Sequence, residues 1–222
     1  MTTSENKNQP VELFPIFLNL TDKSCLVVGG GEAARPKVLA LLETGAKLTV
    51  VSPKLDPVLA QKAAEGQFFW IPELFQLHHL DDMWFVVSTL EEVAVNTRIH
   101  QEAERRGLFL NVVDQPQFCS ALWPARLTRQ PVTLAFSTGG SSPALAGYLR
   151  RKLEKLLPEN FGELALWLGR WREKINPELP DLAARGRFWR TLLDQGLGER
   201  FLEGDQPGAE GMIRKSLEKE RS

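Results

Sequence analysis

Short apolar runs alternate with stretches of helical periodicity along the first half of the chain. Five runs are rich in branched or aromatic residues and apolar on both faces, as parallel strands covered by helices on both sides are. They span 24–28, 48–51, 68–71, 84–87 and 108–113. The stretches between them predict helices over 33–43, 57–65 and 95–106, stopped by Gly45, Gly66 and Gly107. This alternation predicts an α/β fold with a Rossmann-like, doubly wound parallel sheet.

The pattern changes after residue 114. Two runs, 125–127 and 132–136, flank a turn and predict a pair of short antiparallel strands. A helix is expected over 143–157, and three prolines divide the remainder into further helices, one of them capped by Asp181. We therefore expect a Rossmann domain over 1–114, a small α+β segment over 115–150 and a C-terminal helical domain over 151–222.

Charge and hydropathy exclude several classes of function. The 222 residues carry 27 basic and 28 acidic side chains, a net charge of −1, which gives no global field to hold nucleic acid or an anionic membrane. No 18-residue apolar run is present to span a bilayer. The polar N-terminus lacks the apolar core of a signal peptide, so a cytoplasmic protein is expected.

The glycine-rich segment after the first predicted strand is a candidate dinucleotide site. Gly29, Gly31 and Ala34 satisfy the spacing G-x-G-x-x-A between a strand and a helix. Gly29 permits a tight turn, Gly31 permits close approach of a pyrophosphate, and Ala34 permits close packing of helix on strand. The helix N-terminus offers the anion unpaired N–H groups. The alternative is a glycine turn in a fold that binds another ligand or none.

The second strand lacks the acid that usually binds the ribose hydroxyl about 20 residues further on. The strand ends instead in Ser52, Pro53 and Lys54. Ser52 could bond the ribose hydroxyl, and Lys54 could meet a 2′-phosphate. The residues alone leave NAD and NADP open.

Polar residues also follow the other strands. Ligands of open α/β sheets gather outside the C-terminal strand ends, so Ser52, Ser88–Thr89 and Asn111–Asp114 are expected to line one crevice. A partly desolvated Asp114 could serve as a general base or as a hard oxygen ligand for a divalent cation. The alternative is an aspartate that caps the following loop.

The segment Ser137–Pro143 is a second glycine-containing segment that precedes a predicted helix, as the first glycine turn does. Hydroxyls and bare glycine backbone precede a helix, and Arg150, Arg151 and Lys152 follow. Such a segment favours carboxylates or phosphates, although a simple helix cap is the alternative. Two anion-binding segments in one α/β chain indicate a redox enzyme for a polyanionic small molecule.

Four blocks in order carry a family resemblance. They are FPIFLNLTDKSCLVVGGGEAA from Phe14, GAKLTVVSP, NVVDQPQFCSALWPA from Asn111, and STGGSSPALAGYLRRKLEKLLP from Ser137. Over about residues 14–195 the chain resembles the precorrin-2 dehydrogenase family, which also forms the N-terminal part of multifunctional sirohaem synthases. The resemblance implies NAD-dependent oxidation of the tetrapyrrole precorrin-2 to sirohydrochlorin, and a homodimer that pairs through the segment 115–150.

The resemblance also assigns roles to residues. The family's essential acid falls on Asp114, and its NAD contacts fall on the glycine turn with Glu32 and Ala33 and on Pro53 and Lys54. With the strand ends included, the expected cofactor residues are Gly29, Gly31, Glu32, Ala33, Ser52, Pro53, Lys54 and Thr89. The expected substrate residues are Asn111, Thr138, Gly139 and Ser141.

Some members of that family also insert Fe²⁺ into the product. Asp114 and His100 are the metal-ligand candidates here, in a chain with two cysteines and three histidines. Three positions depart from the family pattern, namely Pro36, Ser120 and the pair Thr89–Leu90. Two competing hypotheses remain: a chelatase without dehydrogenase activity, and an NAD-binding regulatory module that does not turn over tetrapyrroles.

Overall fold

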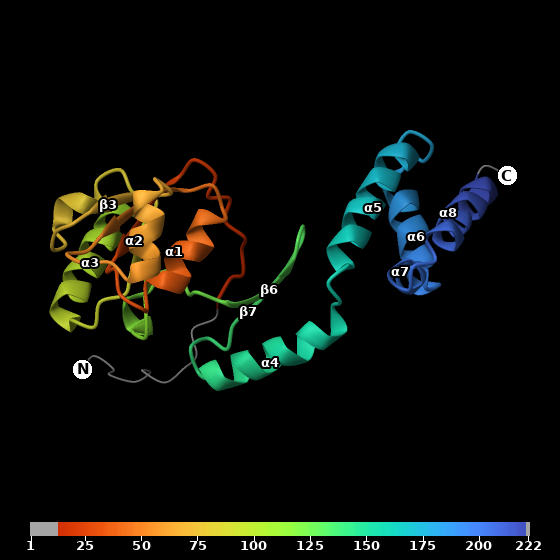
Figure 1. The fold of residues 1–222 in the computed structure, drawn as a ribbon. Coiled ribbons are helices and arrows are strands. Elements are labelled where there is room, and N and C mark those ends of the chain that lie inside the picture. The colour runs from red at the N-terminus through yellow and green to blue at the C-terminus, as the bar shows by residue number, and fades with distance from the viewer. Residues whose placement is uncertain (1–12, 221–222) are drawn as a thin grey trace, which may run out of the picture. The chain divides into compact units, whose positions relative to one another are not determined.

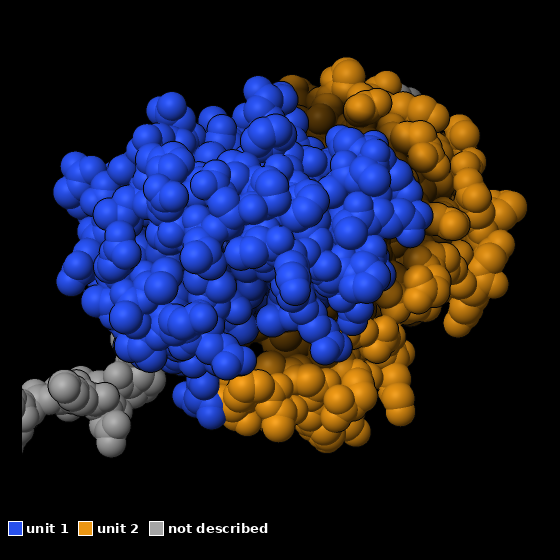
Figure 2. Space-filling view, turned by 60° about the vertical axis from the view of Figure 1, so that its left-hand side comes forward, with its two compact units in different colours: residues 1–123, 139–141 blue, residues 124–138, 142–222 orange. Residues whose placement is uncertain are grey.

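The computed structural model describes residues 13–220 and divides the chain into two compact units (Figures 1 and 2). Unit 1 comprises the chain up to residue 123 together with 139–141, and unit 2 comprises 124–138 and 142–222. The sequence predicts three segments, with boundaries after residues 114 and 150. The division into two units does not test these boundaries, so they remain a prediction. Each unit is described by itself.

Unit 1 contains a five-stranded parallel sheet. Its strands are β1 (Ser24–Val28), β2 (Lys47–Val51), β3 (Phe69–Ile71), β4 (Phe85–Ser88) and β5 (Phe109–Val112). They lie in the order β3-β2-β1-β4-β5 and all neighbours pair in parallel. This confirms the Rossmann-like sheet. The strand order reverses between β1 and β4, and such a switch point opens a crevice at the carboxyl ends of the strands.

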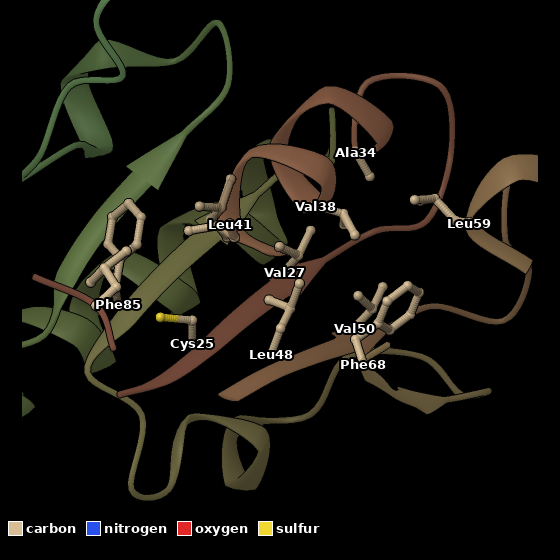
Figure 3. Packing of buried hydrophobic residues seen from close by; sticks show 12 residues of the cluster. Cys25, Val27, Ala34, Val38, Leu41, Leu48, Val50, Leu59, Phe68 and Phe85 are labelled. Carbon is tan, nitrogen blue, oxygen red and sulfur yellow. The ribbon is translucent and has the colours of Figure 1, made fainter. Parts of the chain in front are cut away.

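Helices cover both faces of this sheet. The helices α1 (Arg35–Leu42) and α2 (Pro57–Ala64) pack on the face that carries Cys25 and Val27 (Figure 3). The helix α3 (Val93–Arg106) and the 3₁₀ turn η1 (Leu77–Leu80) pack on the opposite face, against Leu26 and Val28. Successive β1 residues point to opposite faces, so both sets are buried. Gly45, Gly66 and Gly107 follow α1, α2 and α3 with φ of 73°, 72° and 67°, as expected for left-handed caps.

One strand departs from the expected pattern. All five runs were expected to be covered on both faces, yet Phe69 and Trp70 of β3 are 68% and 36% exposed. β3 is the edge strand beside β2, so neighbouring elements cover it incompletely. The apolar run at 68–71 predicts the strand itself but not its position at the edge.

Unit 2 contains a hairpin and five helices. The strands β6 (Ala125–Arg129) and β7 (Val132–Phe136) are antiparallel, as predicted. They are followed by α4 (Pro143–Leu156), α5 (Phe161–Ile175), α6 (Leu182–Asp194), α7 (Leu197–Leu202) and α8 (Gln206–Glu220). Asp181 caps α6 as expected, accepting a hydrogen bond from the Ala184 N–H at 2.8 Å. Among the helices within 13–220, none has the length and apolarity needed to cross a bilayer.

The C-terminal helices enclose their own apolar core. It is built from Trp167, Trp171, Phe188, Leu192 and Ile213, among others. From the sequence, the charged residues 214–222 are expected to form an exposed or frayed helix; residues 221 and 222 lie outside the described residues. Residues 214–220 form the end of α8 and are mostly exposed, as expected. The helix begins earlier, at Gln206, and its buried residues Ala209 and Ile213 anchor it to this core.

Candidate functional site

The first two glycines of the turn are fixed by the fold itself. Gly29 has φ of 105° and donates a hydrogen bond to the Val51 carbonyl at 2.9 Å. Gly30 is buried, and a Cβ there would lie 2.5 Å from the Lys54 carbonyl oxygen. Its own carbonyl accepts a hydrogen bond from Asp56 N–H at 2.6 Å. The sequence motif does not single out Gly30, although three consecutive glycines are the visible signal for it.

The third glycine faces open space. A Cβ on Gly31 would meet no atom within 4 Å, and Gly31, Glu32 and Ala33 are exposed. Among the described residues, none accepts a hydrogen bond from the backbone N–H groups of these three. α1 has neither a side-chain N-cap bond nor an acid in its first turn. The turn therefore offers an anion free N–H donors and the positive end of a helix, with room at Gly31 for close approach.

In the loop after β2, the hydroxyl of Ser52 is hydrogen-bonded to the backbone of the same loop. The Ser52 hydroxyl donates to the Lys54 carbonyl at 2.7 Å, and the Ser52 carbonyl accepts from the Trp70 indole N–H at 2.9 Å. Ser52 is buried, whereas Pro53 and Lys54 are exposed. The Ser52 hydroxyl proton thus stabilises the loop, and the predicted ribose contact would have to use its oxygen as an acceptor.

The end of β4 is tied to β1. The Thr89 hydroxyl donates to the Val28 carbonyl at 3.1 Å and lies against Gly29, where a Cβ would clash with it. Behind it, the Ser88 hydroxyl donates to the Asn96 carboxamide at 2.7 Å in the interior, and Asn96 donates to the Leu90 carbonyl at 2.8 Å. Asn96 could not be identified from the sequence, because an asparagine within a helical pattern gives no sign that it is buried.

The residues at the end of β5 differ in exposure. Asn111 is 5% exposed and donates from its amide nitrogen to the Ala121 carbonyl at 3.0 Å. Its amide oxygen is buried without a hydrogen-bond partner among the described residues. Asp114 has a left-handed backbone, with φ of 58°, and is exposed. This differs from the partial desolvation expected for Asp114, because the chain's own side chains do not cover it.

Cys119 holds the loop that carries Asp114. Its sulfur accepts a hydrogen bond from the Val112 N–H at 3.1 Å and donates to the Val112 carbonyl at 3.3 Å. Burial raises the pKa of the Cys119 thiol. The thiol is thus protonated at neutral pH and serves as a structural group in this loop.

The segment after β7 forms a loop that caps α4. Ser142 donates from its N–H to the Thr138 hydroxyl at 3.1 Å, and the Ser142 hydroxyl accepts from the Leu145 N–H at 3.2 Å. Gly139 and Gly140 have φ of 63° and 82°. A Cβ on Gly140 would lie 3.9 Å from the Pro116 side chain. Gly140 therefore lies beside the loop after β5, at a residue two positions after Asp114 in the sequence. Ser141 is exposed.

His100 and Asp114 do not form part of a larger ligand cluster. The His100 Nδ1 lies 3.1 Å from the Phe118 carbonyl, which fixes the ring against the β5 loop. Within residues 13–220, no group of three or more His, Cys, Asp or Glu side chains could hold a metal ion. The structure therefore shows no resident metal centre in the part of the chain that it describes.

The sheet order and the open glycine turn define the Rossmann-like class of dinucleotide-binding folds. Residues 16–125 match a family model described as "Putative NAD(P)-binding", and 160–217 match the sirohaem synthase dimerisation region. The chain belongs to the sirohaem synthase family, which confirms the resemblance drawn from its sequence. The dimerisation match lies outside the segment 115–150, for which dimer pairing remains a prediction.

Two curated relatives illustrate this membership. The chain is 40% identical over 200 residues to siroheme synthase 1 of Aeromonas salmonicida, covering 90% of this chain and 43% of that protein. It is 38% identical over 207 residues to the siroheme synthase of Chromobacterium violaceum, covering 93% and 44%. The chain thus spans less than half the length of the curated relatives that it matches.

A solved structure shows the same fold. The protein named SirC, a precorrin-2 dehydrogenase, superposes with a TM-score of 0.75 at 24% sequence identity. The match covers 91% of this chain and 100% of that one. The likeness therefore extends over both the Rossmann-like sheet and the helical C-terminal region.

Proposed function

We propose that this chain oxidises precorrin-2 to sirohydrochlorin with NAD as the hydride acceptor. The observation that carries the proposal is the open glycine turn with its free N–H groups, on the same sheet edge as Asp114. The name of SirC and the names of the curated relatives support this choice of substrate. The proposal remains one for this chain, since those relatives are more than twice as long.

The residues present fit a dinucleotide. The N–H groups of 31–33 would hold the pyrophosphate, because no described residue accepts a hydrogen bond from them. The absence of a side chain at Gly31 leaves open space beside them for the ligand. Pro53 and Lys54, exposed after β2, would contact the adenosine end. When bound, NAD supplies a nicotinamide ring that accepts a hydride. No acid stands directly at the end of β2, where the chain reads Ser52-Pro53-Lys54, so the choice of NAD over NADP rests on the family likeness.

The chain's own residues supply the proton chemistry. Oxidation of precorrin-2 removes one hydride and one proton, and we assign the proton to a carboxylate oxygen of Asp114. The bonds of Cys119 to Val112 and of Thr89 to Val28 fix the strand ends beside this carboxylate. Substrate would cover Asp114 and exclude the water that surrounds it in the free chain.

An anaerobic assay tests this function. The purified chain is mixed with precorrin-2 and NAD⁺, and NADH and sirohydrochlorin are followed by absorbance. One NADH is expected for each sirohydrochlorin formed. NAD binding without turnover would favour the regulatory module, and metal uptake by sirohydrochlorin without NADH production would favour the chelatase.

Iron insertion remains a prediction of the family resemblance. Fe²⁺ would be a substrate, held transiently by the candidate ligands Asp114 and His100, rather than by a resident ligand cluster of the described residues. Adding Fe²⁺ or Co²⁺ to the product of the same assay tests it. Metal insertion no faster than in a protein-free control would remove this activity.

We further propose that the chain acts as a homodimer. α4 buries no residue, and Leu145, Tyr148, Leu149 and Leu156 on one of its faces are 47%, 49%, 38% and 72% exposed. A second copy would cover this face, because an exposed apolar face of this kind marks an interaction surface. The matched dimerisation region, 160–217, supports a dimer but does not include α4.

A charge on this face of α4 should weaken the dimer. Leu149→Glu is expected to shift the sedimenting species toward the monomer, because a carboxylate would be buried at the contact. Glu154→Gln, on the opposite face of the helix, is the control and should leave the mass unchanged. A wild-type chain that sediments as a monomer at assay concentrations would overturn the proposal.

A further inference from the structure

Lys37, in the first turn of α1, contributes to none of the contacts described above. Its Nζ stands 4.3 Å from the centroid of the Trp123 ring, which stacks on Phe85 with the centroids 6.2 Å apart. The side chain is half-buried. Among the described residues, none accepts a hydrogen bond from its ammonium or pairs with it as a salt bridge. Lys37 therefore presents three N–H donors that the chain itself leaves available.

This position is unfavourable for a cation. The N-terminus of a helix carries partial positive charge, which repels an ammonium in its first turn. Burial lowers the pKa of Lys37, and the charge of Asp114 opposes that effect. A half-buried cation at the positive end of a helix loses solvation and gains little from its own element. Such a charge is stabilised when an anion occupies the space in front of it.

Asp114 compensates Lys37 only in part. The carboxylate is close enough to act on the ammonium through its charge, but the two groups do not form an ion pair. The Trp123 face adds a cation–π contact, which holds the ammonium in place without using its N–H groups. The arrangement leaves a held cation within range of the charge of the proposed catalytic acid.

The neighbours of Lys37 identify the kind of anion. The pyrophosphate has its own donors in the turn at 31–33, whereas Lys37 faces Cys119, Trp123 and Asp114 from the loop after β5. That loop also carries Asp114, the proposed catalytic acid. We propose that Lys37 binds a ring carboxylate of the tetrapyrrole and positions the macrocycle against Asp114. This inference rests on the proposed function.

Removal of this charge should weaken tetrapyrrole binding selectively. Lys37→Met keeps an unbranched side chain on Trp123 and removes the ammonium. We expect the KM for precorrin-2 and the Kd for sirohydrochlorin to rise by about 10-fold or more, the loss of one charge-assisted hydrogen bond. The kcat and the Kd for NAD should stay within about 3-fold. Sirohydrochlorin binding, followed by tryptophan fluorescence quenching, gives a readout independent of turnover.

Two further variants control the test. Lys37→Arg keeps the charge and should retain most of the affinity. Lys47→Met removes an exposed lysine at the opposite end of the sheet, where it faces Asp22, and should change neither constant. Thermal unfolding of each variant reports whether the fold survives, and Lys37→Gln is the second neutral variant if Lys37→Met does not fold.

The outcomes separate this inference from the proposed function. Unchanged tetrapyrrole constants in a folded Lys37→Met would overturn the role of Lys37. Weaker NAD binding with unchanged tetrapyrrole binding would overturn it too, and would reassign the ammonium to the pyrophosphate. A wild-type chain that binds sirohydrochlorin but forms no NADH would overturn the proposed reaction alone. Failure of the wild type to bind sirohydrochlorin would overturn both.

Discussion

Asp114→Asn should lower the kcat for precorrin-2 oxidation by about 10²- to 10⁴-fold, the usual contribution of a positioned general base. The carboxamide has nearly the same shape but cannot take the proton. The Kd for NAD should stay within about 2-fold of the wild-type value. Asp114 follows β5, whereas the free N–H groups of the glycine turn lie at 31–33, after β1. Single-turnover kinetics and calorimetry measure the two quantities separately.

The backbone at Asp114 decides which variant gives a clean result. Its φ of 58° is left-handed, a conformation that asparagine tolerates at least as well as aspartate. Asp114→Ala would add backbone strain of about 1 kcal/mol to the loss of the carboxylate. Asp114→Gly relieves that strain while also removing the side chain, so equal losses in the glycine and asparagine variants would assign the effect to the carboxylate. An undiminished rate in Asp114→Asn would remove Asp114 from the mechanism.

The fold could be predicted because its signals are local. Buried parallel strands need apolar residues on both faces, and left-handed helix caps favour glycine, so β1, β2, β4 and β5 could be located from the sequence. The exposure of Phe69 could not be predicted, because it depends on β3 lying at the edge of the sheet. Strand order is a property of the assembled sheet rather than of any one run.

Some features of the candidate site could likewise be predicted from the sequence, and others could not. The turn at Gly29 and Gly31 follows from a spacing between neighbouring elements, and the structure gives each glycine a separate reason. The contact of Lys37 with Trp123 joins residues that are distant in the chain, and Asn96 and Cys119 bond Ser88 and Val112 across the loops that follow β4 and β5. No periodicity reports such contacts. Asp114 illustrates the limit further, since its position after β5 was readable while its exposure and left-handed backbone were not.

Gly31→Val should abolish NAD binding without unfolding the protein. A Cβ at Gly31 would meet no protein atom within 4 Å, and its φ lies outside the left-handed region, so the variant should keep the wild-type unfolding temperature within a few degrees. The isopropyl group would instead fill the space that a pyrophosphate needs beside the free N–H groups. We expect the Kd for NAD, measured by calorimetry, to rise by at least about 100-fold.

The neighbouring glycine provides the matched control for this prediction. A Cβ at Gly30 would lie 2.5 Å from the Lys54 carbonyl and 2.8 Å from the Ser52 Cβ, where backbone and buried atoms cannot move aside cheaply. Gly30→Ala should therefore destabilise the fold by about 1–3 kcal/mol, the cost of overpacking a well-packed site. A folded Gly31→Val that binds NAD with wild-type affinity would show that the open space at residue 31 is not the pyrophosphate site. If Gly31→Val is instead destabilised as much as Gly30→Ala, both glycines are required by the fold. The turn would then no longer be supported as the pyrophosphate site.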